Sequence, residues 1–574
     1  MKAKIVVVGI SLILVVGVII GVIVTVNRGG HSDSGVTNNG VSPATDTLSS
    51  GMKAVTAICS PTDYKEACMN SLSPIAKQNS SVSTKDLFKA VFDVTIEGVK
   101  KAMEKSGTLG KGVTNSTQKM ALEDCQELLQ YAIHELEASV SSVGDSEMHT
   151  VNDRADELKS WLSAVISYQQ TCIDGLDHPE LKSALMDQGL LNATQLTSNV
   201  LAIVTEISAI LNSFDVGTNF KSNSRRLLET HGVDEQGFPS WFSASDRRLL
   251  ASNQINNMVK PNAVVAKDGS GQYKTISAAL DAYPKNLVGR YVIYVKAGVY
   301  DEYITVTKEK VNVYMYGDGP RKTIITGSKS NRDGYSTFRT ATFSAIGNGF
   351  IARSIGFSNR AGPEGHQAVA LRVQSDASAF YNCRMDGYQD TLYVHANRQF
   401  YRNCVISGTV DFIFGDSNTL IQNSLIIVRK PMDSQQNTIT AQGRTDQRET
   451  TGLVIQNCRI VPEAKLFQMR FKIPTYLGRP WKEFSRTVIM ESMLSDFIQP
   501  DGWLPWAGNF ALDTLYYAEY GNRGPGAKTD KRVNWKGYKV INRAEAQKFT
   551  AGPFLLGSKW LSNTGSPYFL GFKR

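Results

Sequence analysis

The chain has 574 residues, of which 42% are hydrophobic and 20% charged, and this predicts a globular protein of several domains. Seven cysteines exclude a disulfide framework as the main scaffold, although they can staple separate parts. Residues 1–250 carry 21 basic and 28 acidic side chains, whereas residues 251–574 carry 41 and 25. The basic half indicates a polyanionic ligand, namely nucleic acid, anionic lipid or an acidic polysaccharide, with simple solubility as the alternative.

The N-terminal segment is apolar. Residues 5–26 contain no charged side chain, and 22 residues span roughly 33 Å as a helix, which is enough to cross a bilayer. We predict that residues 1–28 form a signal anchor, with a cleaved signal peptide as the alternative. In both cases the chain enters the secretory pathway, and the precursor contacts a membrane through residues 5–26. Residues 29–52 are rich in Gly, Ser, Thr and Asn and predict a flexible linker.

Residues 53–207 show the period of amphipathic helices. Leu122, Cys125, Leu129, Ile133 and Leu136 recur at steps of three and four, which places them on one helical face. The segments 86–105 and 152–172 show the same period. We therefore predict an antiparallel, all-α helical bundle.

Four cysteines lie in this region, and in a secreted protein they favour disulfides over a zinc site. Their spacing, together with the sequence WLSAVISYQQTC, resembles the pectin methylesterase inhibitor family. The resemblance implies a four-helix-bundle pro-domain with disulfides Cys59–Cys68 and Cys125–Cys172.

Two kinds of modification site are predicted. N-glycosylation sequons occur in the acidic half at Asn79, Asn115 and Asn192. Residues 208–260 form a second linker, in which the tetrapeptide RRLL occurs twice and offers accessible processing sites, at Arg225, Arg226, Leu227 and Leu228 and at Arg247, Arg248, Leu249 and Leu250.

Residues 261–574 contain short β-rich runs that alternate with Gly and Asn. Asn382, Asn403, Asn423 and Asn457 occupy like positions in four of these runs, which indicates a ladder of stacked turns. The segment predicts an all-β parallel β-helix, in which each coil contributes a strand to each face.

One pattern occurs twice at a spacing of 21 residues and pairs Cys383 with Cys404, Gly387 with Gly408 and Asp390 with Asp411. In a β-helix, equivalent positions of consecutive coils lie about 4.8 Å apart. Two carboxylates this close do not both ionise easily, so one is expected to keep its proton as a general acid while the other acts as a nucleophile or base. The alternative is a pair of turn aspartates that cap backbone groups.

The surrounding residues favour catalysis. Gln389 and Gln367 offer neutral amide donors for an oxyanion, and Arg479 can hold one aspartate ionised through two hydrogen bonds. Trp481 offers a flat face for a sugar ring. His366 and His395 lie at no metal-ligand spacing, and neither a Ser-His-Asp arrangement nor a need for a metal or cofactor is visible.

Five motifs, GVYDE, QAVALR, GYQDTL, DFIFG and LGRPW, occur in the order typical of the plant pectin methylesterases, and the basic half resembles that family. The resemblance implies a right-handed parallel β-helix that hydrolyses methyl esters of polygalacturonate (EC 3.1.1.11). It assigns Asp411 as nucleophile, Asp390 as proton donor and base, Gln389 as transition-state stabiliser with support from Gln367, and Arg479 as the group that orients Asp411. Its substrate contacts correspond to Thr337, Gln367, Arg479 and Trp481.

One position departs from this family. Ser424 stands where the family carries a cysteine that pairs with the equivalent of Cys404. That bridge cannot form here, and Cys383–Cys404 is the substitute considered. The pairing of Cys383, Cys404 and Cys458 stays open.

The expected ligand is methyl-esterified homogalacturonan, and the expected protein partner is the chain's own pro-domain or a separate inhibitor. The mature enzyme is expected to be a monomer in the extracellular cell wall, with no nucleic-acid partner. The alternatives are a pectate lyase or polygalacturonase, a non-catalytic pectin-binding or inhibitor protein, and a nucleic-acid-binding protein. We expect the acidic half to inhibit the basic half until the linker between them is cleaved. The alternative is that the acidic half only assists folding or export.

Overall fold

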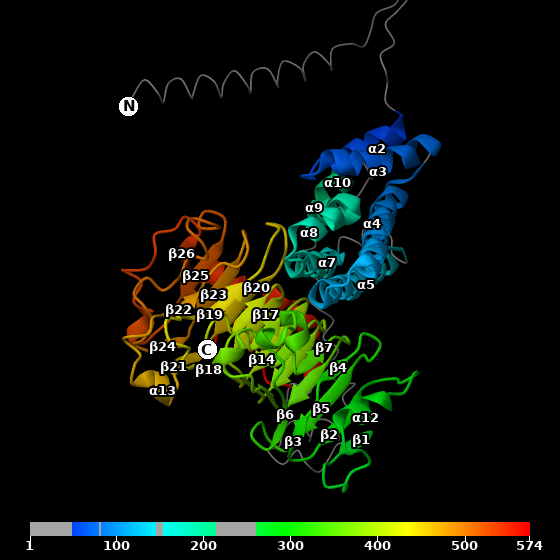
Figure 1. Ribbon diagram of the computed structural model, residues 1–574. Coiled ribbons are helices and arrows are strands. Elements are labelled where there is room, and N and C mark those ends of the chain that lie inside the picture. Colours follow the sequence, from blue (N-terminus) through cyan, green and yellow to red (C-terminus); the bar gives the residue numbers. More distant parts are fainter. Residues whose placement is uncertain (1–48, 80–81, 145–152, 214–259, 574) are drawn as a thin grey trace, which may run out of the picture. The chain divides into compact units, whose positions relative to one another are not determined.

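The computed structural model describes residues 49–79, 82–144, 153–213 and 260–573 (Figure 1). The predicted signal anchor and both RRLL sequences lie outside these residues. Within them, no helix combines the length and the apolar character needed to cross a membrane.

The acidic half folds into helices that pack through their apolar stripes. Its four long helices are α4 (Thr84–Gly112), α5 (Ser116–Gly144), α7 (Ala155–Gly175) and α9 (Leu191–Thr205). Shorter helices precede and join them: α2 (Ser50–Cys59), α3 (Lys65–Gln78), α8 (Pro179–Leu185), η1 (Met186–Leu190) and α10 (Ile207–Ser213). The predicted stripe of α5 is buried, with Leu122, Leu129 and Leu136 at most 1% exposed. The first residues of α2 fall inside the predicted linker 29–52.

Two disulfides fasten the helices. Cys59–Cys68 joins the end of α2 to the start of α3, and Cys125–Cys172 ties α5 to α7. The second bridge holds together two of the helices that contact the basic half. The three sequon asparagines are all exposed. Their side chains are therefore accessible for glycosylation, which stays a prediction.

The basic half is a stack of parallel coils with three sheets. The eleven-stranded sheet contains β1 (Ala263–Val265), β2 (Tyr291–Val295), β5 (Val313–Gly317), β8 (Ile351–Arg353), β11 (Ser378–Tyr381), β14 (Arg398–Arg402), β17 (Asn418–Gln422), β20 (Gly452–Gln456), β23 (Arg486–Met490), β25 (Tyr516–Tyr520) and β26 (Tyr538–Val540). The eight-stranded sheet contains β3 (Gly298–Asp301), β6 (Thr323–Gly327), β9 (Gly356–Asn359), β12 (Arg384–Asp386), β15 (Val405–Gly408), β18 (Leu425–Val428), β21 (Arg459–Pro462) and β24 (Met493–Leu494).

The third sheet carries the candidate site. In chain order its seven strands are β4 (Ile304–Val306), β7 (Phe343–Ala345), β10 (Leu371–Val373), β13 (Leu392–Val394), β16 (Ile413–Gly415), β19 (Asn437–Gln442) and β22 (Thr475–Gly478), and their spatial order is the same. Each strand therefore lies beside its counterpart in the next coil, as the parallel β-helix prediction requires.

The predicted asparagine ladder forms the turns between the eleven- and eight-stranded sheets. Asn382, Asn403, Asn423 and Asn457 all have φ between 52° and 54°, a left-handed conformation that asparagine tolerates better than most residues. One neighbouring pair also makes a side-chain contact, since the Asn457 amide donates to the Asn423 side-chain oxygen. The same left-handed turn in each coil thus explains why asparagine recurs at this position.

The interior of the coils is apolar, and three cysteines lie in it. Cys383, Cys404 and Cys458 are buried free thiols, so the Cys383–Cys404 bridge considered from the sequence is not formed. Ser424 stands where the family carries a cysteine. Its hydroxyl oxygen accepts a hydrogen bond from the Cys404 N–H at 3.0 Å. The hydrogen bond between Ser424 and the Cys404 backbone thus lies where the family would have a disulfide.

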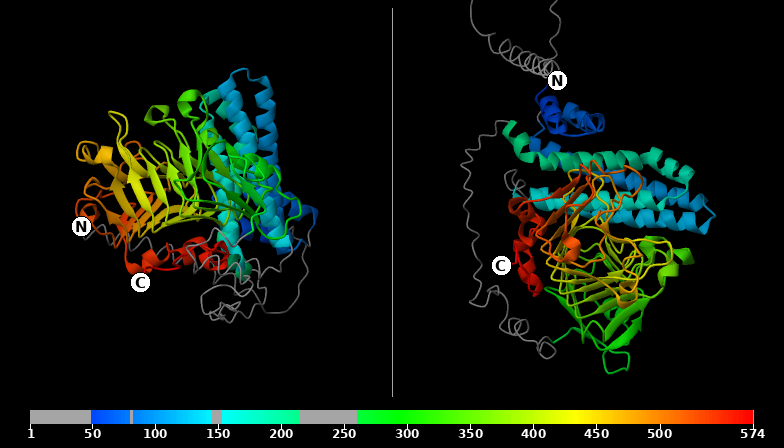
Figure 2. Two further views of the ribbon diagram at one scale, coloured as in Figure 1. Left: turned by 90° about the horizontal axis from the view of Figure 1, so that it is seen from below. Right: turned by 90° about the vertical axis from the view of Figure 1, so that its left-hand side faces the viewer.

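Short helices cover parts of the β-helix. α12 (Ile276–Asp281) packs against the first coils, whereas α13 (Ala464–Phe467) follows β21. α14 (Arg543–Gln547) and α15 (Ala551–Leu555) cover the outer face of the eleven-stranded sheet (Figure 2). Neither α14 nor α15 contributes to the cluster that joins the bundle to the seven-stranded sheet.

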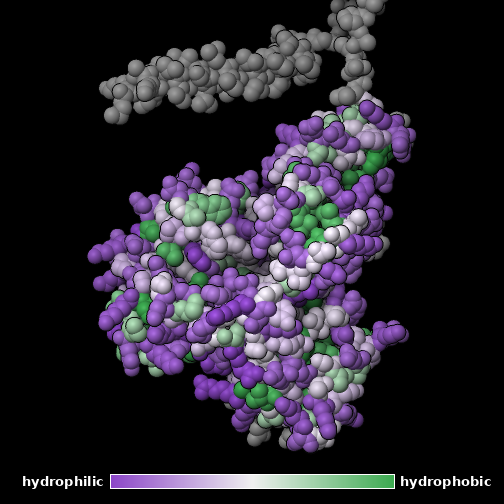
Figure 3. Space-filling view, in the orientation of Figure 1, coloured by the Kyte–Doolittle hydropathy of each residue, from purple (hydrophilic) through white to green (hydrophobic). Residues whose placement is uncertain are grey.

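The helical bundle packs onto the outer face of the seven-stranded sheet. One apolar cluster contains bundle residues together with Phe338, Val369, Tyr393, Phe414 and Ala441 of the β-helix. The face of the molecule in Figure 3 is mostly hydrophilic, with hydrophobic side chains in scattered patches. The contact between the halves thus buries aromatic groups of the sheet that carries the candidate site.

Candidate active site

The two aspartates stack at the entrance to adjacent strands. Asp390 precedes β13 and Asp411 precedes β16, and the register that pairs Leu392 with Ile413 places the two aspartates one above the other. Both aspartates have a left-handed backbone conformation, with φ of 61° at Asp390 and 50° at Asp411. Non-glycine residues in this region are uncommon and cluster at functional sites. The fold therefore brings together the pair that the 21-residue repeat singled out.

Asp411 is the aspartate that the protein holds with donors. Arg479, which follows β22, donates from Nε to Oδ1 at 2.9 Å and from Nη2 to Oδ2 at 2.6 Å. The hydroxyl of Thr438, in β19, donates to Asp411 Oδ1 at 2.6 Å. A guanidinium fork and a hydroxyl thus donate to the carboxyl group of a side chain that is only 7% exposed.

Asp390 has the opposite environment. Burial raises the pKa of Asp390 well above its ordinary value, the negative charge of Asp411 raises it further, and Arg479 offsets only part of this. Its side chain is 7% exposed. Asp390 is thus the member of the pair whose protonated form the surroundings favour.

Neutral donors and aromatic rings complete the site. Gln389, Gln367 and Thr337 line the same cavity as the aspartates. Trp481 contacts Phe414 edge-on, and its ring lies so close to Gly443 that a Cβ there would be 2.8 Å from the indole. A glycine at this position lets the indole lie against the backbone.

Sequence reasoning missed several side chains. Phe414 and Tyr393 stack with ring centroids 4.3 Å apart, and their spacing of 21 residues is the same repeat that identified the aspartates. Trp506 lies 4.3 Å from the Arg479 guanidinium. Thr438 and Trp506 lie in coils whose lengths differ from 21 residues. The constant offset of 21 residues therefore does not identify them.

The two histidines lie outside the catalytic arrangement. His395 is buried, and burial together with the charge of Arg372 lowers its pKa well below the ordinary value. Its Nε2 lies 2.9 Å from Thr171 Oγ1 of α7. His366 is exposed. Among the described residues, no group of three or more His, Cys, Asp or Glu side chains is placed to hold a metal ion.

A cavity of about 550 Å³ surrounds the pair, and both halves of the chain form its walls. The β-helix supplies Gln389, Asp390, Asp411, Arg479, Trp481 and Trp506, and α5 and α7 supply Met120, Asp124, Leu128, Thr171 and Asp174. The helices therefore form part of the wall of the groove in which the aspartates lie.

The family profile described as Pectinesterase matches residues 262–558, which is more than half of the chain. The chain belongs to the pectinesterase family. The profile described as Plant invertase/pectin methylesterase inhibitor matches residues 53–203, within the helical half. The fold and the two matches agree on a pectinesterase β-helix preceded by an inhibitor-like bundle.

Relatives cover both halves. Pectinesterase/pectinesterase inhibitor 3 of Arabidopsis thaliana is 45% identical and covers 92% of each chain, and pectinesterase 1 of Citrus sinensis is 45% identical and covers 89% of this chain and 88% of its own. The solved pectin methylesterase from carrot is 56% identical over 55% of this chain and 99% of its own, with a TM-score of 0.54. A pectinesterase β-helix therefore forms in a chain that has no counterpart to the helical half.

Replacing Asp411 by Asn should lower the pKa of Asp390. The substitution removes the negative charge that raises this pKa, while burial, the larger cause, remains. The pKa should thus fall yet stay above the ordinary aspartate value of about 3.9. Infrared difference spectroscopy of the protonated-carboxyl band, with Asp390→Asn to assign it, measures the shift. An unchanged or higher Asp390 pKa would contradict the coupling.

Proposed function

We propose that the β-helix half hydrolyses methyl esters of polygalacturonate through covalent catalysis by Asp411. The observation that carries this assignment is the divided aspartate pair: Asp411 is held by Arg479 and Thr438, whereas Asp390 has its pKa raised. A nucleophile and a proton donor thus lie side by side without a metal or an organic cofactor in any step.

In the first half-reaction, the Asp411 carboxylate attacks the C6 carbonyl carbon of the ester. Gln389 and Gln367 donate to the oxyanion of the tetrahedral intermediate. The bond between C6 and the methoxy oxygen then breaks, and Asp390 gives its proton to that oxygen, so methanol leaves. The product is a mixed anhydride between C6 and Asp411.

In the second half-reaction, Asp390 is ionised and takes a proton from a water molecule. The resulting hydroxide attacks the anhydride, which splits into a free galacturonate carboxyl and the Asp411 carboxylate. Asp390 is protonated again, so the cycle closes with one water consumed and one methanol released. A non-catalytic pectin-binding protein would have no use for this arrangement of donors.

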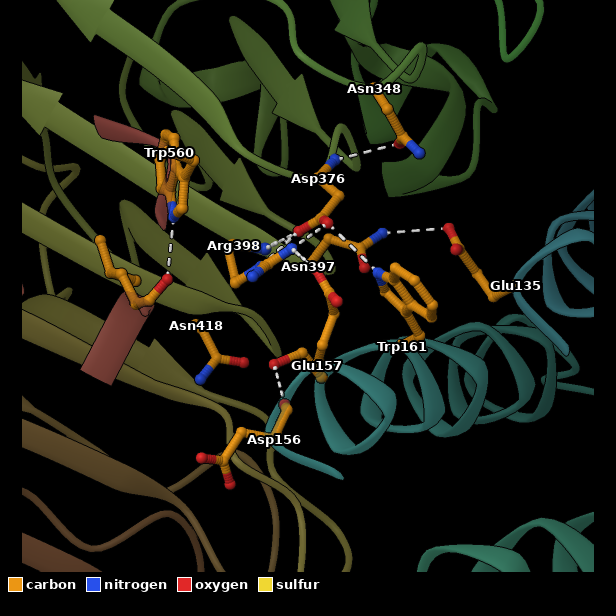
Figure 4. Close-up of polar contacts among 12 residues, drawn as sticks. Glu135, Asp156, Glu157, Trp161, Asn348, Asp376, Asn397, Arg398, Asn418 and Trp560 are labelled. Carbon is orange, nitrogen blue, oxygen red and sulfur yellow. Dashed lines mark hydrogen bonds and ion pairs between the residues drawn. The ribbon is translucent and has the colours of Figure 1, made fainter. Parts of the chain in front are cut away.

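We also propose that the helical bundle inhibits the enzyme until the linker is cut. Support comes from the cavity, since α5 and α7 cover part of the groove that a polymer must enter. Further support comes from contacts outside the cavity. The Trp161 indole donates to Asp376 Oδ2 at 3.2 Å (Figure 4), and Lys308 Nζ lies 2.5 Å from Glu135 Oε1. Tethering makes this docking intramolecular and therefore favourable.

The Asp376 contact is built on a preformed pair. Arg398 donates to both carboxylate oxygens of Asp376 at 2.9 and 2.6 Å. Burial would raise the pKa of Asp376, but Arg398 and the Trp161 indole hold it at about 2. The Asp376 carboxylate is therefore charged at all physiological pH values. It can accept the Trp161 hydrogen bond both in the secretory pathway and at the cell wall.

The location follows from the proposed substrate. We place the precursor in the secretory pathway and the cut enzyme in the plant cell wall, where pectin is found. Anchoring of the precursor through residues 5–26 and a monomeric mature enzyme remain part of this proposal. The net charge of residues 251–574 attracts a polyanionic wall polymer.

Asp390→Asn and Asp411→Asn should each abolish methanol release from esterified pectin while the fold persists. One variant lacks the proton donor and the other the nucleophile. A kcat above about a tenth of wild type, equivalent to a loss under about 1.4 kcal/mol, would contradict the role of that residue. Asp433→Asn, at an exposed loop carboxylate outside the cavity, is the matched control.

Cutting the linker should activate the enzyme. A specific protease site placed in residues 214–259 allows one preparation to be assayed uncut and then after cutting and separation of the halves. Because the helices cover part of the groove, methanol release should rise at least about tenfold, which corresponds to about 1.4 kcal/mol. Equal activity of the two forms would refute inhibition and leave export or folding as the role of the bundle.

A further inference from the structure

A second cavity lies where the bundle meets the C-terminal helices of the β-helix half. Its volume is about 640 Å³, and none of the described residues lines both this cavity and that of the aspartate pair. Two residues of its wall, Asp156 and Asn418, appear in Figure 4 below the Asp376–Arg398 pair. The wall comes from α7, α9, β23, β25 and the region of α14 and α15, which supply, in this order, Lys159, Thr205, Arg486, Tyr516, Lys548 and Phe554.

Arg486 lines this cavity without a counterion. Arg398 and Arg486 each begin a strand of the eleven-stranded sheet, and Arg398 binds the Asp376 carboxylate at 2.9 and 2.6 Å. The Arg486 guanidinium donates instead to two carbonyl oxygens, those of Thr450 and Glu449, each at 3.3 Å. Within the described residues, no carboxylate lies at ion-pair distance from Arg486. A buried charge without a partner is costly, so an anion in the cavity would stabilise this side chain.

The carboxyl group of Glu449, which also lines the cavity, offsets only part of this charge. Burial raises the pKa of Glu449 well above its ordinary value, and the negative charge of Asp416 raises it further. Glu449 Oε1 accepts two hydrogen bonds from backbone N–H groups of its own loop, at 2.9 and 2.6 Å. Burial also lowers the pKa of Arg486, and the positive charge of Arg444 lowers it further. The wall thus carries positive charge that its own carboxyl groups do not balance.

Lys548 is the second cation of the wall without a partner. It is exposed, and it forms no ion pair with any residue that the structure describes. Apart from Glu449, the remaining charged side chains of the lining have partners, namely Lys159 with Asp156, Arg448 with Asp63, and Glu545 with the Tyr516 hydroxyl. Arg486 and Lys548 are therefore the two positive charges that a ligand in the cavity can meet.

Aromatic rings and side-chain amides complete the wall. The ring centroids of Tyr516 and Phe549 lie 5.4 Å apart, and those of Phe549 and Phe554 lie 6.0 Å apart. Asn418 and Gln447 add neutral hydrogen-bonding groups. A sugar offers an apolar C–H face to such rings and hydroxyl groups to such amides, and a cavity of this size suits a small ligand. An inorganic anion would use the two cations and leave the rings without a contact.

We propose that this cavity binds a short oligosaccharide that carries carboxylates, with one carboxylate at Arg486 and another at Lys548. Because both halves of the chain form the wall, the ligand binds the assembled chain more tightly than it binds either half. By linkage, the bound ligand stabilises the docking of the bundle. The binding does not depend on the proposed esterase function, whereas the stabilised docking adds a regulation to that function.

Titration calorimetry of the uncut chain with trigalacturonate tests the binding. Lys548→Gln and Arg486→Gln should each weaken the affinity by about tenfold, because a charge-assisted contact is lost. Lys548 is exposed, so its variant keeps the test valid if Arg486→Gln does not fold. Lys559→Gln, at an exposed lysine outside the lining, is the matched control and should bind like the wild type. Equal losses in Lys548→Gln and Lys559→Gln would mean general charge attraction and would overturn the site, as would a lack of binding.

Further probes test the chemistry of the ligand and its place. Citrate and inorganic phosphate carry charge without a sugar ring, and a galactose trisaccharide carries rings without charge. Each should bind at least about tenfold more weakly than trigalacturonate. Citrate that binds as tightly would overturn the assignment to an acidic sugar. Trp481→Ala, in the catalytic cavity, should leave the affinity for trigalacturonate unchanged. A loss in this variant with none in Lys548→Gln would place the trisaccharide in the catalytic groove and overturn the second site.

The effect on docking is measured after the linker is cut. At a trigalacturonate concentration about ten times its Kd, the dissociation constant of the two halves should fall at least about threefold in the wild type. Lys548→Gln should show no such change. An unchanged or higher dissociation constant in the wild type would overturn the bridging role. Failure of the cut enzyme to release methanol would refute the proposed esterase function instead, and neither binding measurement depends on that result.

Discussion

The proposed mechanism depends on one asymmetric contact, in which Arg479 donates to both oxygens of Asp411 and not to Asp390. Stacking two aspartates in adjacent coils places like charges within about 4.8 Å of each other, which the buried setting penalises. The guanidinium fork and the Thr438 hydroxyl donate to Asp411, whereas burial and the negative charge of Asp411 raise the pKa of Asp390. In the proposed mechanism Asp390 carries the proton, and one pair supplies both a nucleophile and an acid.

The helical half covers part of the same groove and meets it with opposite charges. Its helices α5 and α7, joined by Cys125–Cys172, lie over the seven-stranded sheet and bury Tyr393 and Phe414. Asp124 on α5 and Asp174 on α7 pair with Arg339 and Lys482 of the β-helix.

Much of the site could be predicted because the repeat is regular where the catalysis occurs. A constant offset of 21 residues identifies Asp390 and Asp411, and the same offset also relates Tyr393 to Phe414. Thr438 follows a longer loop, 27 residues after Asp411, so the offset fails there. The contacts of Asp124 and Asp174 join positions more than 200 and 300 residues distant from their partners, and no local pattern encodes them.

The cysteines show the limit of the same reasoning. Stacked positions made Cys383–Cys404 a reasonable bridge, yet both thiols are free and the neighbouring serine hydrogen-bonds to the Cys404 backbone. Proximity in the repeat therefore gave the right neighbours but not the bond between them. The apolar period located helices but not their ends: α4 contains the whole segment 86–105, and α7 begins inside the segment 152–172.

The most direct measurement is the steady-state kinetics of Arg479→Lys in the cut enzyme. Lysine keeps the positive charge but cannot form the planar two-pronged contact with Asp411. If that contact divides the roles of the two aspartates, kcat should fall by about a hundredfold, or about 2.7 kcal/mol, with the fold unchanged. Near-wild-type kcat in this variant would show that a positive charge alone suffices, and it would contradict the central role of the fork.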